Sequence, residues 1–145
     1  MSIDAIKMWH ERARPAPTEE NFNVQLGCHL EEVAEMLGTL EAPDKNLDEL
    51  RALKHVVEMA ASRLKSGYLK VSISDRKEFL DAAADQIVTA VGAAHCAKMN
   101  IAEAVRRVNH SNWSKYDSDG KPIFNPHGKI MKGPFYVPPS LEGLY

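Results

Sequence analysis

The sequence predicts an all-α protein, a bundle of four to five helices with a non-helical C-terminal extension. Two observations predict this class. Apolar residues recur every three or four positions through residues 1–110, and capping or helix-ending residues separate these periodic stretches. Residues 116–145 then hold four glycines and five prolines and show no helical period. We therefore expect a helical domain over residues 1–115 and an extension over 116–145, packed on the same domain or on a neighbouring subunit.

The first two helices are predicted from their caps and their apolar spacing. Ser2 is the candidate cap of a helix that ends near Ala13, before a proline-rich connection. Thr18 is the expected cap of a second helix, which ends at Gly38. The second helix carries one continuous apolar stripe, formed by Phe22, Leu26, Leu30, Val33 and Leu37.

Two longer helices are predicted in the middle of the chain. One begins near Asn46 and closes at Gly67, because glycine commonly follows the last helical residue. The next is capped by Ser74 or Asp75 and runs to about Met99. Its apolar face consists of Leu80, Ala83, Ile87, Val91 and Ala94. The many alanines of this helix would permit close contact with another helix.

A short fifth helix and a small hairpin complete the predicted elements. Asn100 and Glu103 have the spacing of a capping box, which predicts a helix through roughly His110. In the extension, residues 121–124 and 128–131 have the composition of two short strands joined by a turn. The extension is rich in Phe, Ile and Tyr, so we expect it to pack against the bundle rather than to be disordered.

Composition restricts the possible functions. The 44% hydrophobic and 26% charged residues are typical of a soluble globular protein, and the net charge of -2 provides no basic field for nucleic acid. No apolar run approaches the roughly 20 residues that span a bilayer, and no signal peptide is recognisable at the N-terminus. Cys28 and Cys96 lack metal-type spacing and indicate reduced thiols. We expect a cytoplasmic protein that binds neither nucleic acid nor a membrane.

Three carboxylates cluster on the second predicted helix. Glu31 and Glu32 are adjacent, and Glu35 follows them by four and three positions. All three therefore project from one side of the helix. Like charges at such spacings weaken a helix by about a few tenths of a kcal/mol per pair. Either a divalent cation neutralises this cluster, or the carboxylates are simply solvated by water.

A second acidic flank borders the apolar face of the fourth predicted helix. Asp81 and Asp85 are four residues apart, and Glu78 lies one turn earlier. If the two acidic helices pack antiparallel, their carboxylates converge on one volume that suits Mg²⁺, which prefers carboxylate oxygens and water. The alternative is that these acids are ordinary solvated surface charges. A di-iron site fits less well, because no glutamate has a histidine three residues later.

These motifs resemble those of the all-α nucleoside triphosphate pyrophosphohydrolases, the MazG-like and phosphoribosyl-ATP pyrophosphohydrolase-like superfamily. Glu32-Val-Ala-Glu35 matches the first acidic pair of that family, and Asp81 with Asp85 resembles the second. The second pair departs from the family's ExxD form: a motif that ends at Asp85 has Ala82 at its first position, whereas one that ends at Asp81 has Glu78 there. We favour Asp85 with Asp81 as its partner, because the apolar run that follows the motif starts after Asp85. The likeness continues through the segments 108–116 and 128–134, and spans roughly residues 20–140.

The resemblance implies cleavage of a nucleoside triphosphate to its monophosphate and pyrophosphate. Mg²⁺, for which Mn²⁺ could substitute, would be the cofactor and would be held by Glu32, Glu35, Asp81 and Asp85. Glu31 or Glu32 would accept the proton of the attacking water. The resemblance also implies a homodimer or homotetramer, with sites formed by bundled helices at subunit contacts.

Five residues are candidates for substrate binding. Asn112 and Lys115 would contact phosphate or sugar, Lys129 and Lys132 are weaker phosphate candidates, and the amide of Gln25 could contact a base edge. The lysines could instead be ordinary solvated surface charges, and Gln25 a polar residue at the boundary of the core. Two other functions stay open: a dUTPase-like member of the same superfamily, and a non-catalytic helical interaction module.

Overall fold

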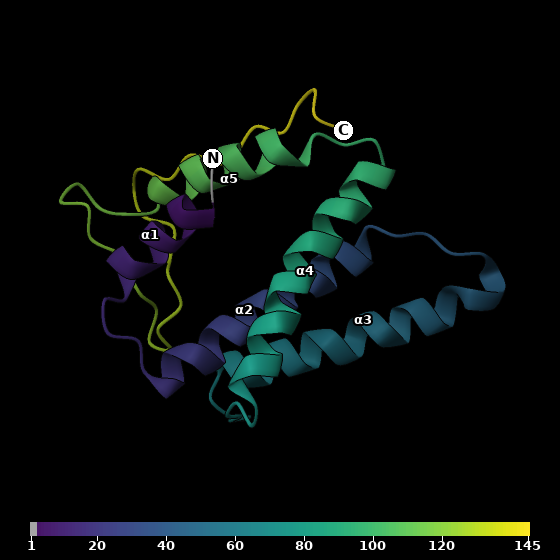
Figure 1. Cartoon of the computed structure of the whole chain (residues 1–145), viewed down its shortest axis with the longest axis horizontal. Coiled ribbons are helices and arrows are strands. Elements are labelled where there is room, and N and C mark those ends of the chain that lie inside the picture. Colours follow the sequence, from purple (N-terminus) through teal and green to yellow (C-terminus); the bar gives the residue numbers. More distant parts are fainter. Residues whose placement is uncertain (1–2) are drawn as a thin grey trace. The chain divides into compact units, whose positions relative to one another are not determined.

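Five helices follow one another along the chain, and no strand forms within the described residues (Figure 1). The structure is a computed structural model that describes residues 3–145, so the expected cap at Ser2 lies outside the described residues. The all-α class is therefore confirmed. The helices are α1 (Ile3–Ala13), α2 (Glu19–Gly38), α3 (Asp44–Lys65), α4 (Arg76–Cys96) and α5 (Ile101–Trp113).

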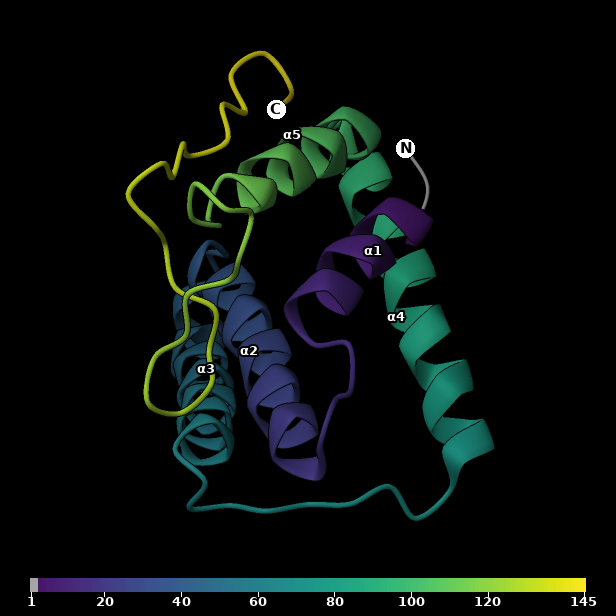
Figure 2. The same cartoon turned by 90° about the vertical axis from the view of Figure 1, so that its left-hand side faces the viewer.

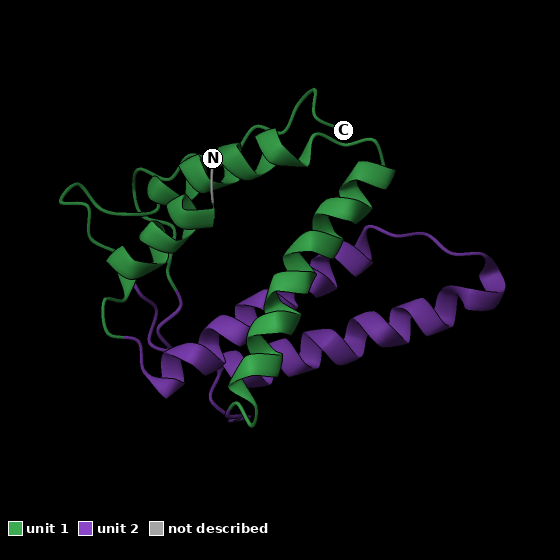
Figure 3. Cartoon of the chain, in the orientation of Figure 1, with its two compact units in different colours: residues 1–16, 73–123, 130–145 green, residues 17–72, 124–129 purple. Residues whose placement is uncertain are grey.

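The chain divides into two units, which are coloured separately in Figure 3. Unit 1 comprises residues 1–16, 73–123 and 130–145, and therefore contains α1, α4 and α5. Unit 2 comprises residues 17–72 and 124–129, and contains α2 and α3. The C-terminal extension thus contributes residues to both units. The expected division into two domains at residue 115 stays a prediction.

Side-chain caps set the starts of α2 and α4. Thr18 and Asn21 form a capping box, in which the Asn21 N–H donates to Thr18 Oγ1 (3.2 Å) and the Thr18 N–H donates to Asn21 Oδ1 (3.1 Å). Asp75 rather than Ser74 caps α4, by accepting bonds from two backbone amides. The expected starts of these two helices are therefore confirmed.

Three helix ends differ from the predicted ones. The third helix begins at Asp44, two residues before the predicted start, and Pro43 is at its cap position without a side-chain hydrogen bond. The fourth ends at Cys96 instead of near Met99, because Lys98 adopts a left-handed φ of 62°. The fifth continues to Trp113 rather than stopping near His110.

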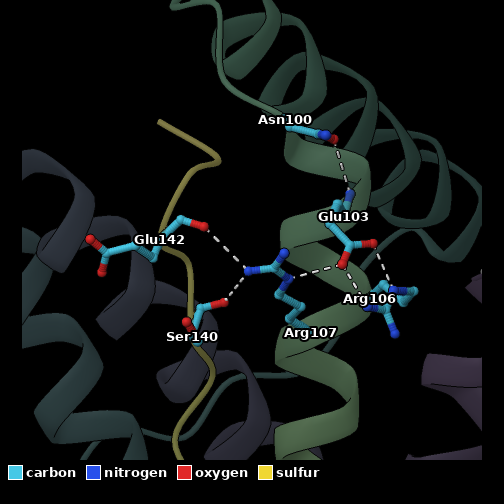
Figure 4. A network of polar contacts seen from close by, with 6 residues as sticks. All are labelled: Asn100, Glu103, Arg106, Arg107, Ser140 and Glu142. Atoms are coloured by element: carbon cyan, nitrogen blue, oxygen red, sulfur yellow. Dashed lines mark hydrogen bonds and ion pairs between the residues drawn. The ribbon is translucent and has the colours of Figure 1, made fainter.

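Only half of the capping box expected at the start of α5 forms (Figure 4). The Asn100 side chain accepts a bond from the Glu103 N–H at 3.2 Å. The Asn100 N–H does not turn to Glu103, because it donates to the Leu144 carbonyl at 2.8 Å. Glu103 binds Arg106 and Arg107 instead, and these arginines lower the pKa of its carboxyl to about 2.

The end of the extension is anchored on α5 by main-chain carbonyls. Arg107 donates to the carbonyls of Ser140 (2.9 Å) and Glu142 (3.4 Å), as Figure 4 shows. Ser111 donates its hydroxyl to the Val137 carbonyl at 2.6 Å. These bonds tie the last residues of the extension to α5 within unit 1.

The extension contains a tight turn, but no strand among the described residues. The Asn125 N–H donates to the Lys129 carbonyl (2.9 Å), and the Met131 N–H donates to the Ile123 carbonyl (2.7 Å). The Asn125 side chain accepts bonds from the His127 and Lys129 amides, as asparagine commonly does in turns. The hairpin is thus not confirmed, although the turn at its expected position is present.

Unit 2 is built on the close packing of α2 against α3, which lie side by side (Figure 2). A Cβ at Gly27 would lie 2.7 Å from Lys65 Cγ and 2.9 Å from the Ala61 carbonyl oxygen, so only glycine fits here without a shift. The residues of the predicted apolar stripe on α2 are only half-buried. The buried residues of the two helices are Asn23, Val24, Gly27, Ala34, Ala61 and Leu64.

A buried asparagine joins the segment after α3 to α2. Asn23 donates its amide to the carbonyls of Glu19 and Val71, both at 3.0 Å, and accepts a bond from the Val71 N–H at 2.7 Å. These bonds satisfy the polar groups of a side chain that is only 5% exposed. Asn23 thereby fixes the path of the chain as it leaves the α2–α3 pair.

The core of unit 1 is aromatic. Trp9 and Tyr116 stack with their ring centroids 5.8 Å apart, and Ala13 and Ile130 pack beside them. Trp9 donates its indole N–H to the Asn112 carbonyl (2.9 Å), and Tyr116 donates its hydroxyl to the Trp9 carbonyl (2.7 Å). Trp9 is therefore a core residue, because its ring and its polar group are both engaged within the unit.

The fourth helix presents its apolar face to solvent. None of its residues is buried, and Leu80 (71%), Ile87 (49%) and Val91 (45%) are strongly exposed. The sequence predicted these residues to face a helical core. Exposure of several large apolar side chains along one helix is typical of an interaction surface.

The structure also bears on two expectations drawn from composition. No helix within residues 3–145 combines the length and the apolar character that a membrane crossing requires. Neither Cys28 nor Cys96 forms a disulfide.

Gly27→Ala should destabilise the chain by about 1–2 kcal/mol, because the added methyl group must displace the backbone of α3. Gly92→Ala is the matched control, because Gly92 lies in α4 with nothing within 4 Å of an added Cβ. That control should stabilise the chain by up to about 1 kcal/mol through higher helix propensity. Urea denaturation measures both. Equal effects of the two substitutions would contradict the close approach of α2 and α3.

Candidate functional site

Two lysines bind the same carboxylate in unit 2. Lys65 Nζ bonds to Oε1 of Glu31, and Lys129 Nζ bonds to Oε2 at 2.7 Å. The Glu31 side chain is 29% exposed, so both ion pairs are partly shielded from water. Charge-assisted hydrogen bonds of this kind are stronger than neutral ones. Glu31 is therefore neutralised within the chain, and no cation from solution is needed for it.

The local fold explains why both lysines reach Glu31. Gly27 and Glu31 are four residues apart, so they lie on one face of α2. The Lys65 side chain crosses α2 at Gly27, where the missing Cβ leaves room for it, and ends at Glu31. Lys129 is positioned by the turn in which the Asn125 side chain accepts a bond from its amide (2.8 Å).

The charges of this cluster shift its pKa values in opposite directions. Burial would raise the pKa of Glu31, but the hydrogen bonds and charges of Lys129 and Lys65 outweigh it and hold that pKa below its usual value. The hydrogen bond to Glu31 raises the pKa of Lys129, against the opposing effect of burial. Weaker electrostatic contributions from Cys28 and Glu32 also raise it.

The remaining four acids of the predicted metal site are exposed. Glu32 and Glu35 belong to unit 2, whereas Asp81 and Asp85 belong to unit 1. Across residues 3–145, none of these four forms a salt bridge. In the same range, no three His, Cys, Asp or Glu side chains are grouped as a metal site. Glu32 and Glu35 therefore differ from Glu31, whose charge is matched internally.

The predicted substrate-binding residues fall into both units. In unit 2, Gln25 is exposed on α2, and Lys129 is bound to Glu31. In unit 1, the Lys115 ammonium lies 5.8 Å from the centroid of the Trp9 ring, and the Lys132 ammonium lies 4.8 Å from that of Tyr136. The Asn112 carbonyl accepts the bond from the Trp9 indole. Of these residues, the structure brings only Lys129 into contact with a predicted catalytic residue.

Sequence reasoning missed Lys65. It lies at the end of α3, where a basic residue is ordinary because it favours the helix dipole. No local pattern connects it with Glu31, which is 34 residues away. The only available signal was Gly27, whose presence inside an apolar helix indicates close approach of another element.

A hollow of about 520 Å³ lies between α5 and the extension, and several of its polar side chains bind within the chain. Its lining includes Arg107, Ser111 and Ser114. Arg107 binds Glu103, and the two serine hydroxyls donate to main-chain carbonyls. These bonds indicate that the hollow anchors the extension, so we place the candidate site on α2 instead.

The α2 site combines cations that could bind phosphate oxygens with free carboxylates that could hold a metal ion. No family model matches the chain, and no curated protein or solved structure matches it either. The chemistry of the site must therefore be inferred from the residues themselves: Lys65, Lys129, Glu31, Glu32 and Glu35.

Glu31→Gln should destabilise the chain by about 1–2 kcal/mol at neutral pH, because it leaves two lysines without their shared partner. A lowered pKa means that the ionised carboxylate contributes stability above its ordinary value of 4.5, and that this contribution is lost as pH falls through the lower folded value. The difference between wild type and Glu31→Gln should therefore shrink on acidification. Denaturation from pH 7 to pH 3 measures it.

The control for this experiment is Glu58→Gln, which breaks an exposed ion pair with Lys54 on α3. It should cost less than Glu31→Gln at neutral pH, since exposed pairs contribute little. If wild type and Glu31→Gln lose stability in parallel on acidification, the role given to Glu31 is wrong.

Proposed function

We propose that the chain is a Mg²⁺-dependent nucleoside triphosphate pyrophosphohydrolase, which releases a nucleoside monophosphate and pyrophosphate. One observation carries the proposal: α2 holds three clustered glutamates, but internal lysines bind only Glu31. Glu32 and Glu35 are exposed and have no salt bridge within the described residues. Such a pair of exposed carboxylates is best suited to bind a hard divalent cation. The resemblance of the motifs to the pyrophosphohydrolases suggests the substrate.

Asp81 and Asp85 of α4 would complete the ligand set. They are exposed carboxylates four residues apart, so they fit the oxygen donors that Mg²⁺ requires. When bound, Mg²⁺ would neutralise phosphate oxygens and lower the pKa of a water molecule. The α2 pair belongs to unit 2 and the α4 pair to unit 1. The proposal allows one chain to supply both pairs, or two subunits to supply one pair each.

Glu32 is better suited than Glu31 to accept the proton of the attacking water. Both oxygens of Glu31 are bound by lysines, which also lower the pKa of that carboxyl and make it a weaker base. Glu32 is exposed and carries no such pair. As water attacks and its proton passes to Glu32, the bond between the α- and β-phosphates breaks.

The substrate-binding roles follow from side-chain chemistry. The exposed amide of Gln25, two turns before Glu32 on α2, would contact the base. Asn112 and Lys115 would contact sugar or phosphate, and Lys132 would contact phosphate.

A homodimer or homotetramer is part of the proposal. The apolar face of α4 is exposed along its length, at Leu80, Ile87 and Val91 among others. Burying such a face against a second copy would remove large apolar side chains from water. A subunit contact through α4 would also bring the acidic flank of this helix close to the contact, since Asp81 and Asp85 border the apolar face.

The catalytic proposal predicts that wild type with Mg²⁺ releases pyrophosphate from at least one nucleotide in a panel of (deoxy)nucleoside triphosphates that includes dUTP. Glu35→Gln should lower kcat/KM by about 100-fold or more, because a metal ligand is lost. Glu20→Gln, an exposed glutamate in the first turn of the same helix, is the control and should leave the rate unchanged. No pyrophosphate release from any nucleotide would defeat the proposal.

The assembly proposal predicts a mass of two or four times the 16.1 kDa chain in light scattering. Leu80→Glu combined with Val91→Glu should shift the protein towards the monomer, because the two charges cannot be buried in an apolar contact. Ile3→Glu, at a position 61% exposed on α1, is the control and should keep the oligomer. A monomeric wild type at micromolar concentration would contradict this part of the proposal.

A further inference from the structure

The cluster around Glu31 has more positive than negative charge. Lys65 and Lys129 share one carboxylate, so the three residues carry one net positive charge. An ammonium group has three donors, and each lysine uses one on Glu31. The Lys65 and Lys129 side chains are 23% and 37% exposed, respectively. Both cations therefore keep donors for an anion that approaches from solvent.

The geometry of the cluster suits an anion with several oxygens. Each lysine bonds to a different oxygen of Glu31, so the two ammonium groups lie on either side of the carboxylate. The Lys65 side chain lies in the space left by the missing Cβ of Gly27, and the backbone of Lys129 is held by the Asn125 side chain. Because both side chains are already held in place, an anion that binds them would restrict little further side-chain motion.

The cluster also adjoins the candidate metal ligands. Glu31 and Glu32 are neighbours in α2, and Lys129 interacts electrostatically with Glu32 as well as with Glu31. Phosphate groups that share a cation with Glu32 would therefore lie one residue along α2 from the carboxylate that both lysines bind. Two phosphates joined by one bridge present enough oxygens to contact the cation and both ammonium groups together.

We propose that Lys65 and Lys129 bind the β- and γ-phosphates of the nucleotide, the part that leaves as pyrophosphate, and that Glu31 is their internal counter-ion. This inference rests on the proposed function. Glu31 neutralises part of the charge of the two lysines before substrate binds. The phosphates then take up the remaining donors of both ammonium groups. In this assignment Glu31 is the counter-ion of the lysines, not a catalytic residue.

The competing interpretation is that the cluster only joins the turn at residues 124–129 to α2 and α3. In that case Lys65, Lys129 and Glu31 would all contribute to folding stability and none of them would contribute to anion binding. A phosphate site would give the lysines and Glu31 different roles. The lysines would be needed for the anion, whereas Glu31 carries the same charge sign as the anion and repels it.

The test uses inorganic pyrophosphate as the probe, titrated into the full-length protein by calorimetry with and without Mg²⁺. Lys65→Gln and Lys129→Gln should each weaken binding about ten-fold, the effect of losing one charge-assisted bond. Lys54→Gln is the control, because Lys54 also lies on α3 and pairs with a glutamate. It should bind pyrophosphate as wild type does. Wild-type affinity in both lysine variants would overturn the inference.

Two further variants separate binding from folding. Lys129→Arg keeps the positive charge and should retain pyrophosphate binding if Lys129→Gln loses it. Glu31→Gln should bind pyrophosphate at least as tightly as wild type, although its thermal midpoint without ligand falls. If Glu31→Gln loses binding to the same extent as the lysine variants, the cluster is only a structural tie.

Failure of this inference and failure of the proposed function give different results. If wild type hydrolyses nucleotides but both lysine variants keep wild-type KM and pyrophosphate affinity, the enzyme stands and the lysine assignment is wrong. If wild type binds pyrophosphate through the lysines but hydrolyses no nucleotide, the anion site stands and the proposed enzyme is wrong.

Discussion

The absence of a side chain at Gly27 is the constraint on which the candidate site depends. It lets α3 approach α2 so closely that the Lys65 side chain passes over α2 at this position. Since Glu31 follows one helical turn later on the same face, the lysine ends at its carboxylate. A close approach of two helices therefore determines a charge pair, and a residue larger than glycine at this position would collide with Lys65 and with the backbone of α3.

That charge pair changes the character of the acidic cluster on α2. In the sequence, three glutamates share one side of a helix and repel one another. In the folded chain, Glu31 is bound by two lysines, while Glu32 and Glu35 stay exposed. Neighbouring residues of one type thus have different surroundings: Glu31 is paired with two cations, and Glu32 and Glu35 are exposed to solvent. In the proposed enzyme, Glu32 would be the better proton acceptor, because its oxygens are not held by lysine.

Local sequence rules predicted the helices well, because caps and periodicity act over a few residues. Thr18 and Asp75 cap their helices as expected. The differences arise where distant segments intervene. Asn100 makes only half of its capping box because its amide bonds to Leu144, 44 residues away. The core pair of Trp9 and Tyr116 joins α1 to the extension, and no helical pattern in the sequence connects these two segments.

The sequence by itself determined the all-α class, most helix ends and the acidic residues of the candidate site, because composition and short spacings encode these features. Only the tertiary structure decided which glutamate is neutralised. Lys65 and Lys129 reach Glu31 from 34 and 98 residues away, and helical periodicity carries no information at such separations. It also decided that the buried face of α2 follows Val24, Gly27 and Ala34 rather than the larger apolar residues, because close helix packing selects small side chains.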